Sequence, residues 1–329
     1  MKYPRFSCAL LLSLSAFPLW AASPAGAPLG AARTPSSEPP VMDAAPPTPL
    51  EDESPGWAFG AKVTLDYCSK QLTYGLIDNP QPIFTPSLEL SFGHADWFTL
   101  ALSIDAIFDT TNYGAKEGGY NNRRYKYQEL TPGITLSRTW KSAEWLGSDL
   151  ETSINYTYEY HPRSCKKPAL EWENPDTQWL KLEISAPDYC LVPHIAVEYQ
   201  LARQGAESGN DGKGAIYATF DVSHTFDLGT RIGLDEEVIT LTPTIGFGVG
   251  NKERNACDFS DWYEENGKSA DTFMLRDGFA RLDLAITPFE NFTLNPYIGC
   301  HQQLDSTGRD ATGSDDFVAF AGIALSYSF

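Results

Sequence analysis

The feature that most restricts the fold is the alternating pattern of the C-terminal segment, from Asp316 to Phe329. Its odd-numbered positions from 317 to 329 are all apolar or aromatic, and its even-numbered positions from 320 onward are mostly small. A side-chain period of two is the pattern of a β-strand whose two faces meet different surroundings. Taken alone, the segment predicts either a strand of a membrane barrel or an ordinary strand of a soluble β-sandwich.

Four residues of this segment carry a resemblance to a known signal. Gly322, Leu325, Tyr327 and Phe329 follow the order of a glycine, an apolar residue, an aromatic residue and a final aromatic residue. This order resembles the last strand of Gram-negative outer-membrane β-barrels, which is read by their barrel-assembly machinery. Phe320 departs from it, since that family usually has a polar residue there. The resemblance implies an assembly signal at these four residues and the assembly machinery as a partner.

Alternating segments recur throughout residues 56–329, and the sequence shows no convincing helical periodicity there. In the first three segments, aromatic residues lie at both ends of the apolar face and aliphatic residues in its middle, as in the aromatic girdles of membrane barrels. We expect twelve strands, an even number as in bacterial barrels, at Trp57–Cys68, Ile83–Phe92, Trp97–Phe108, Tyr127–Trp140, Asp149–Tyr160, Gln178–Ala186, Leu191–Ala202, Ala215–Phe226, Val238–Gly250, Gly278–Thr287, Phe292–Gln302 and Asp316–Phe329. The predicted fold is therefore all-β, a single antiparallel up-and-down transmembrane β-barrel of about twelve strands.

The connections between these strands predict the orientation of the barrel. Those after odd-numbered strands are mostly long and those after even-numbered strands are mostly short, which matches long external loops and short periplasmic turns. The N-terminus is then periplasmic. Prolines fall inside five of the expected strands, where each removes a backbone donor, so we expect bulges or lost ladder bonds there: Pro86, Pro132, Pro193, Pro243 and Pro296.

The first 55 residues do not look like part of the barrel. Residues 1–22 predict a secretory signal peptide, because Lys2 and Arg5 precede a short apolar core from Ala9 to Trp20. Residues 23–55 are rich in Pro and Ala and then acidic, which predicts a disordered periplasmic linker. The barrel itself then occupies residues 56–329, and we expect it in the outer membrane of a Gram-negative bacterium.

Composition excludes several classes of function. A formal charge of −19 opposes nucleic-acid binding, for which a basic surface supplies most of the affinity. The cysteines show no CxxC spacing, so we expect neither a zinc site nor another metal or cofactor. Mean hydropathy is slightly negative, which is compatible with a barrel because only alternate residues face lipid.

The opposite faces of the expected strands carry charged residues, which would line the lumen. The acidic ones include Asp66, Glu89, Asp105, Glu129, Glu151, Glu183, Glu198, Asp221 and Asp283, and the basic ones are Lys62, Lys181 and Arg281. A barrel of twelve strands lies between small filled barrels and large open porins. We therefore expect a narrow, acidic lumen. It is either a cation-preferring pore or a packed interior whose charges satisfy each other.

A second resemblance concerns the region of the first expected loop. Ser69, Gly75, Pro82 and Pro86–Ser87–Leu88 resemble the first hairpin of uncharacterised, porin-like barrel families of Gram-negative bacteria. This resemblance implies a location in the outer membrane and no particular active site. Basic clusters in the expected external loops, at 123–126 and 163–167, could meet lipopolysaccharide phosphates. Outer-membrane lipids and lipopolysaccharide are therefore expected partners.

The function that we expect is a narrow passive pore for small hydrophilic, cation-leaning solutes. A non-conducting structural or surface-interaction barrel is the first alternative, and a soluble all-β binding module is a more distant one. A membrane-embedded hydrolase like the outer-membrane phospholipase family would need His and Ser two residues apart on one strand. None of the five histidines has a serine two residues later, so we expect no catalytic residue and no enzyme.

Overall fold

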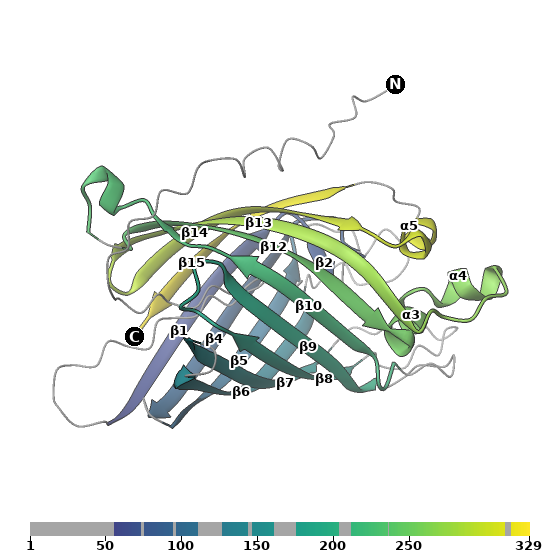
Figure 1. Ribbon diagram of the computed structural model, residues 1–329, viewed down its shortest axis with the longest axis horizontal. Helices are drawn as coiled ribbons and strands as arrows, with labels where there is room; N and C mark the ends of the chain where they lie inside the picture. Colours follow the sequence, from purple (N-terminus) through teal and green to yellow (C-terminus); the bar gives the residue numbers. More distant parts are fainter. Residues whose placement is uncertain are drawn as a thin grey trace, which may run out of the picture.

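A computed structural model describes residues 56–73, 76–94, 97–110, 127–143, 147–160, 176–203, 212–235, 237–312 and 317–329. They form one closed antiparallel barrel (Figure 1). Neighbouring strands along the chain pair around it, and pairing of β10 with β12 and of β15 with β1 closes it. Its twelve long strands are β1 Trp57–Cys68, β4 Ile83–His94, β5 Phe98–Asp109, β6 Tyr127–Ala143, β7 Ser148–Glu159, β8 Thr177–Ser185, β9 Val192–Arg203, β10 Ile216–Ser223, β12 Ile239–Asn251, β13 Phe273–Phe289, β14 Phe292–Gln303 and β15 Val318–Ser328.

The predicted fold class and strand number are confirmed. Strand β1 has the predicted bounds, and most other ends move by only a few residues. The largest difference is in β13, which begins at Phe273 and not at Gly278. Arg276 and Asp277 interrupt the apolar pattern before Gly278, but the backbone of this segment still pairs with the end of β12. The ladder therefore extends past the point where the side-chain alternation ends.

Prolines do occur within the strands, and four of them coincide with breaks in the ladder. Between β4 and β5, the paired positions step from Phe84 to Ser87, on either side of Pro86. Along β14, the pairs with β13 step from Tyr297 to Leu294, on either side of Pro296. Similar gaps lie at Pro132, between β6 and β7, and at Pro243, where the partner of β12 changes from β10 to β11 Phe226–Asp227. The expectation of lost ladder bonds is therefore confirmed at these four prolines, whereas Pro193 pairs with Val222 without a break.

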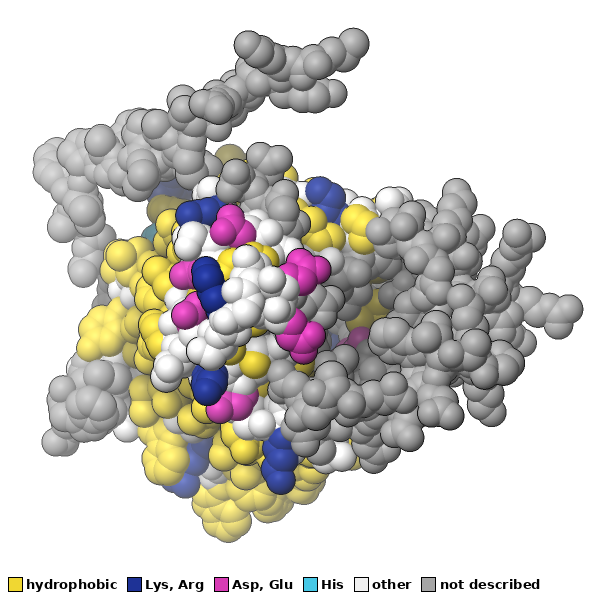
Figure 2. Space-filling view, turned by 90° about the vertical axis from the view of Figure 1, so that its right-hand side faces the viewer, with side chains coloured by type: hydrophobic (Ala, Val, Ile, Leu, Met, Phe, Trp, Pro, Cys, Tyr) yellow, Lys and Arg dark blue, Asp and Glu magenta, His cyan; other side chains and the backbone are white. Residues whose placement is uncertain are grey.

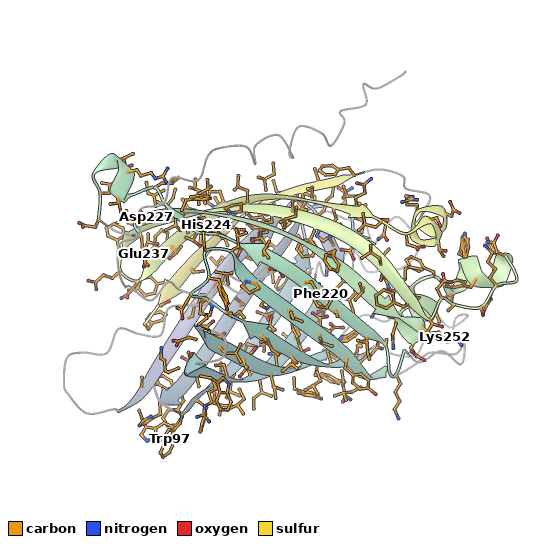
Figure 3. All side chains as sticks on the ribbon, viewed as in Figure 1. Trp97, Phe220, His224, Asp227, Glu237 and Lys252 are labelled. Atoms are coloured by element: carbon orange, nitrogen blue, oxygen red, sulfur yellow. The ribbon has the colours of Figure 1, made fainter. Side chains whose placement is uncertain are left out.

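The outer surface of the barrel is apolar. Aliphatic side chains that point away from the interior are well exposed, such as Leu102 at 50% and Ile154 at 49%. Aromatic residues gather at one end, where the Trp57 ring stacks on Phe92 with 4.6 Å between centroids and Trp97 meets Trp57 edge-on. In Figure 3, Trp97 lies at this end of the barrel. Exposed aliphatic residues bordered by aromatic ones are the exterior of a barrel that sits in a bilayer.

The two ends of the barrel differ (Figure 1). One end, the turn end, carries the start of β1, the C-terminus, and the connection with β11 Phe226–Asp227 and the 3-10 helix η2 Thr230–Ile232. The other end, the helix end, carries the hairpin of β2 Gln71–Thr73 and β3 Leu76–Asn79, and the helices α3 Lys252–Asp258, α4 Ser260–Glu265 and α5 Ser306–Thr312. Figure 2 looks onto the helix end and shows acidic side chains interspersed with Lys and Arg.

Three short helices, α3, α4 and α5, occur in the part of the chain where the sequence shows no convincing helical periodicity. Each has six or seven residues, too few to repeat a 3.6-residue period. Local capping and packing hold them: the Asn251 side chain accepts a hydrogen bond from the Arg254 amide and so caps α3. No helix among the described residues is long and apolar enough to cross a bilayer.

Candidate functional site

The inner face of the barrel carries the charged residues that the sequence singled out. All twelve lie buried or half-buried on the strands, and each has an outward-facing apolar position beside it. Asp66 shows the pattern, being buried between the exposed Leu65 and Tyr67. The strict alternation of a strand sends such residues to the opposite face from their neighbours. The twelve are Lys62, Asp66, Glu89, Asp105, Glu129, Glu151, Lys181, Glu183, Glu198, Asp221, Arg281 and Asp283.

Six of these acids share one half of the inner face, and we name this set the acidic wall. It has one half-buried carboxylate on each of six neighbouring strands, β4 to β9. Asp105 is close enough to Glu89 and Glu129 to feel both charges. Glu129 lies near the helix-end start of β6 and Glu151 near the turn-end start of β7, so the wall extends along much of the lumen. Its members are Glu89, Asp105, Glu129, Glu151, Glu183 and Glu198.

Partners within the wall hold several of these carboxylates in place. Ser153 donates to Glu183 Oε2 at 3.0 Å, and Ser185 donates to Glu151 Oε2 at 3.2 Å. Thr131 donates to Glu129 Oε1 at 2.6 Å. Hydroxyl donors satisfy part of each carboxylate without cancelling its charge. Hydroxyl groups of neighbouring positions therefore hold three carboxylates of the wall in place.

The other half of the inner face extends from β10 through β12, β13, β14 and β15 to β1. Here aromatic side chains pack closely against glycines of the neighbouring strands. A Cβ added at any of these glycines would approach the facing ring atoms to 2.5 Å or less. The Tyr217, Phe279 and Tyr297 side chains are accordingly buried. These aromatic residues were not predicted from the sequence. Glycines inside strands were the available signal, because they mark close approach: Gly248 lies under Tyr217, Gly246 under Phe279, Gly299 under Phe320 and Gly322 under Tyr297.

Three charged residues on this packed half, Asp66, Arg281 and Asp283, are held in one network of hydrogen bonds and an ion pair. Arg281 binds Asp283 with two hydrogen bonds, 2.7 and 2.8 Å long. The Tyr297 hydroxyl reaches across β15 to donate to both Asp66 oxygens, at 3.0 and 3.1 Å, while Arg281 lies over the Tyr297 ring. Asn295 donates to the same Asp283 carboxylate at 3.0 Å. Asp66, Asp283 and Arg281 therefore belong to a satisfied network and not to an open charged surface.

The residues of the expected assembly signal divide between the two faces of β15. Gly322 lies under the Tyr297 ring on the inner face, whereas Leu325 and Tyr327 are exposed on the outer face. Phe329 is 70% exposed and its amide donates to the Ala61 carbonyl oxygen. Gly322 thus has a packing role in the folded barrel whatever role it has in assembly.

A small apolar core closes over the helix end, and we name it the helix-end core. Phe259, Tyr263 and Met274 are buried together, and partly buried apolar residues from the β2–β3 hairpin, α4 and α5 pack against them. Three segments far apart in the sequence therefore meet here. Leu76 comes from the hairpin and Ala311 from α5.

An ion-pair network under α3 joins this core to the barrel. Asp258 binds Arg254 through Nε at 2.8 Å and through a second, shorter contact at Nη2, and binds Arg276 Nη1 at 2.6 Å. Arg276 is fully buried and lies 4.8 Å from the Phe259 ring centroid. Burial pushes the pKa of the Asp258 carboxyl upward, but Arg254 and Arg276 more than offset it and hold this pKa below its usual value of 3.8.

This shift predicts how the helix-end core responds to acid. Because the pKa of Asp258 is lower in the folded chain than in the unfolded chain, its stabilising contribution is complete above about pH 3.8 and is lost as the pH falls through the lower, folded-state pKa. We expect the fluorescence of Trp262, taken as wild type minus Trp262→Phe, to stay constant from pH 7 to pH 4 and to change below. An Asp258→Asn variant should lack this acid step. A transition between pH 7 and pH 5 would contradict the assignment.

Three of the described histidines, His194, His224 and His301, contact carboxylates or backbone. His194 Nδ1 lies 3.2 Å from Asp221 Oδ2, and His301 Nδ1 lies 3.2 Å from Asp277 Oδ2. His224 approaches the Cys190 carbonyl oxygen at 2.5 Å. Among the described residues, no group of three or more His, Cys, Asp or Glu side chains is arranged to hold a metal ion.

Several sequence-based expectations concern residues beyond those that the structure describes. The signal peptide at 1–22 and the linker at 23–55 fall there, as do both basic clusters, at 123–126 and 163–167. These remain predictions.

No protein-family model matches this sequence, and no curated protein matches it. Among solved structures, the chain is similar to outer membrane phospholipase A from Escherichia coli, with 11% identity, a TM-score of 0.41, and coverage of 81% of this chain and 92% of that one. It is also similar to the KdgM porin, with 11% identity, a TM-score of 0.38, and coverage of 82% and 99%. A third similar structure is the outer membrane channel DcaP of Acinetobacter baumannii, with 11% identity, a TM-score of 0.36, and coverage of 83% of this chain and 96% of that one.

Scores this low say nothing about the activity of the chain. The fold rests on the structure itself: a closed barrel of twelve antiparallel strands with an apolar exterior and charged residues inside. This is the architecture of transmembrane β-barrels, which in bacteria belong to the outer membrane.

Proposed function

We propose that this protein is a narrow passive pore of the outer membrane for small hydrophilic solutes, with a preference for cations. One observation carries the proposal: the acidic wall presents a half-buried carboxylate on each strand from β4 to β9, while in the opposite half Arg281 pairs with Asp283 and Asp66 accepts from Tyr297. Accessible charge of one sign along a lumen attracts ions of the other sign and repels ions of the same sign. The packed half narrows the path and restricts it to small solutes.

Single-channel recording in a planar bilayer tests this proposal. We expect stable conductance steps and a reversal potential, in a salt gradient, that favours cations. Glu129→Gln and Glu151→Gln should each lower the cation-to-anion permeability ratio by about twofold. One charge about 10 Å from the ion path changes the energies of cation and anion by about 0.4 kcal/mol each, in opposite directions, in water, and salt screening roughly halves this effect. Glu290→Gln is the matched control, because Glu290 is exposed in the turn between β13 and β14.

The same recording distinguishes a pore from a non-conducting barrel. If protein with the heat-dependent gel mobility of a folded barrel shows no conductance, the proposal of a pore is contradicted. It would support the second candidate, a non-conducting barrel that acts through surface interactions. Two observations favour that candidate: the packed aromatic half of the interior and the helix-end core that joins three connections.

A hydrolase has no comparable support. His194 and His301 face the carboxylates Asp221 and Asp277, and His224 faces a backbone carbonyl oxygen. A general base needs a nucleophile within hydrogen-bond reach. We therefore propose a protein without enzymatic activity, and assign it no catalytic residue.

Orientation and partners are part of the same proposal. The helices and the longer connections lie at one end, which we take as the external one, and the N-terminal linker is then periplasmic. Gly322, Leu325, Tyr327 and Phe329 would be read by the barrel-assembly machinery during insertion. Outer-membrane lipids would cover the apolar exterior, and lipopolysaccharide would contact the external loops.

A further inference from the structure

We infer that Glu183 is one of the carboxylates that set the cation preference of this lumen, and that Lys181 on the same strand opposes it. The inference rests on the pore proposed above and goes further, because it assigns selectivity to one carboxylate of the acidic wall and an opposite effect to a neighbouring base. Both side chains lie on the inner face of β8, two residues apart.

Glu183 is held from three strands at once. Ser153 of β7 donates to its Oε2 at 3.0 Å, Lys181 of β8 lies 3.0 Å from its Oε1, and His194 of β9 lies 3.9 Å from the same Oε1. These contacts fix the carboxylate in one place on the wall. A fixed charge selects ions better than a mobile one, because the field at the ion path does not average out.

The neighbouring acids differ from Glu183 in accessibility. The Glu183 side chain is 29% exposed, whereas Glu198 is 19% exposed and Asp221 only 2%. The Asp221 carboxylate also lies 3.2 Å from His194 Nδ1, so its charge is directed at this histidine and not at the lumen. Within this group, Glu183 is therefore the carboxylate that a passing ion meets most directly.

Lys181 makes the opposite contribution. Its ammonium group lies 3.0 Å from Glu183 and 3.6 Å from Glu198, and its side chain is 18% exposed. At this distance it offsets part of the field of two carboxylates. Removing it leaves both negative charges facing the lumen without this partner, so cation preference should rise. Substitutions two residues apart on one strand then have effects of opposite sign.

The test is the reversal potential of single channels in a potassium chloride gradient, for Glu183→Gln, Lys181→Met and the double variant. The permeability ratio of cation to anion should fall about twofold in Glu183→Gln and rise about twofold in Lys181→Met. It should return close to the wild-type value in the double variant, where one charge of each sign is lost. Lys252→Met is the matched control, because Lys252 is exposed at the first residue of α3; it should leave the ratio unchanged.

The outcomes separate this inference from the pore on which it rests. Conducting Glu183→Gln channels with an unchanged ratio would overturn the role of Glu183 and leave the pore intact. An unchanged or lower permeability ratio in Lys181→Met would overturn the opposing role of Lys181. This measurement tests that role even if Glu183→Gln does not fold. Wild-type barrels that are folded by gel mobility but silent would overturn the pore, and this inference with it.

Discussion

Replacing Gly322 with alanine is expected to destabilise the folded barrel by about 2 to 4 kcal/mol. A Cβ at this position would lie 2.2 Å from the Cζ and hydroxyl oxygen of Tyr297. The ring cannot move aside freely, because its hydroxyl donates to Asp66 and the Arg281 guanidinium lies 4.0 Å from its centroid. The new methyl group therefore forces either an overpacked contact or the loss of a buried hydrogen bond. Urea titration followed by heat-dependent gel mobility measures the change.

Two further variants test the cause. Gly278→Ala is the matched control on β13, because a Cβ there meets Leu304 at 3.4 Å, an ordinary contact, and we expect a much smaller loss. In a Tyr297→Ala background the ring is gone, so Gly322→Ala should then cost little. An equal loss in both backgrounds would show that Gly322 acts by another route, such as the proposed assembly signal.

Replacing Asp258 with alanine is expected to release the helix-end core while leaving the barrel closed. Arg254 and Arg276 would lose their shared carboxylate, and Arg276 is fully buried. Removing one partner of a buried ion pair typically costs about 3 to 5 kcal/mol, because the remaining charge stays away from water. Hydrogen exchange of the peptide 252–266 should therefore speed up by roughly 100-fold or more.

Shape and charge can be separated at this site. Asp258→Asn keeps the size of the side chain and removes only the charge, and we expect most of the same loss. Glu264→Ala is the control in α4, because Glu264 is exposed; it should leave exchange near the wild-type rate. If Asp258→Ala and Glu264→Ala exchange alike, the ion-pair network does not hold the helix-end core.

Much of the barrel could be read from local alternation. Strand β1 has the predicted bounds because the polarity of its side chains alternates with the face that they occupy. Leu65 and Tyr67 face outward, and Asp66 between them faces inward. The same period assigned the acids of the wall to the inner face before any contact was known. The short helices could not be predicted from the sequence, because one or two helical turns leave no periodic pattern. Helix α3 depends instead on the Asn251 cap and on packing.

The partners of these side chains could not be read in the same way. Tyr297 meets Asp66 across 231 positions of sequence, and it does so only because β15 lies between β14 and β1 at one register. That register also puts Gly322 under the ring, and the separate register of β8 with β9 puts Lys181 opposite Glu198.

The face that a residue occupies is a property of its own strand, with a period of two, and is therefore written in the local sequence. Strand number and the polarity of each face follow from it. The identity of a contact depends on register between strands and on closure of the barrel, which sum interactions over the whole chain. For that reason the sequence could leave the lumen as either a pore or a packed interior, whereas the folded chain divides it into an accessible acidic wall and a packed aromatic half.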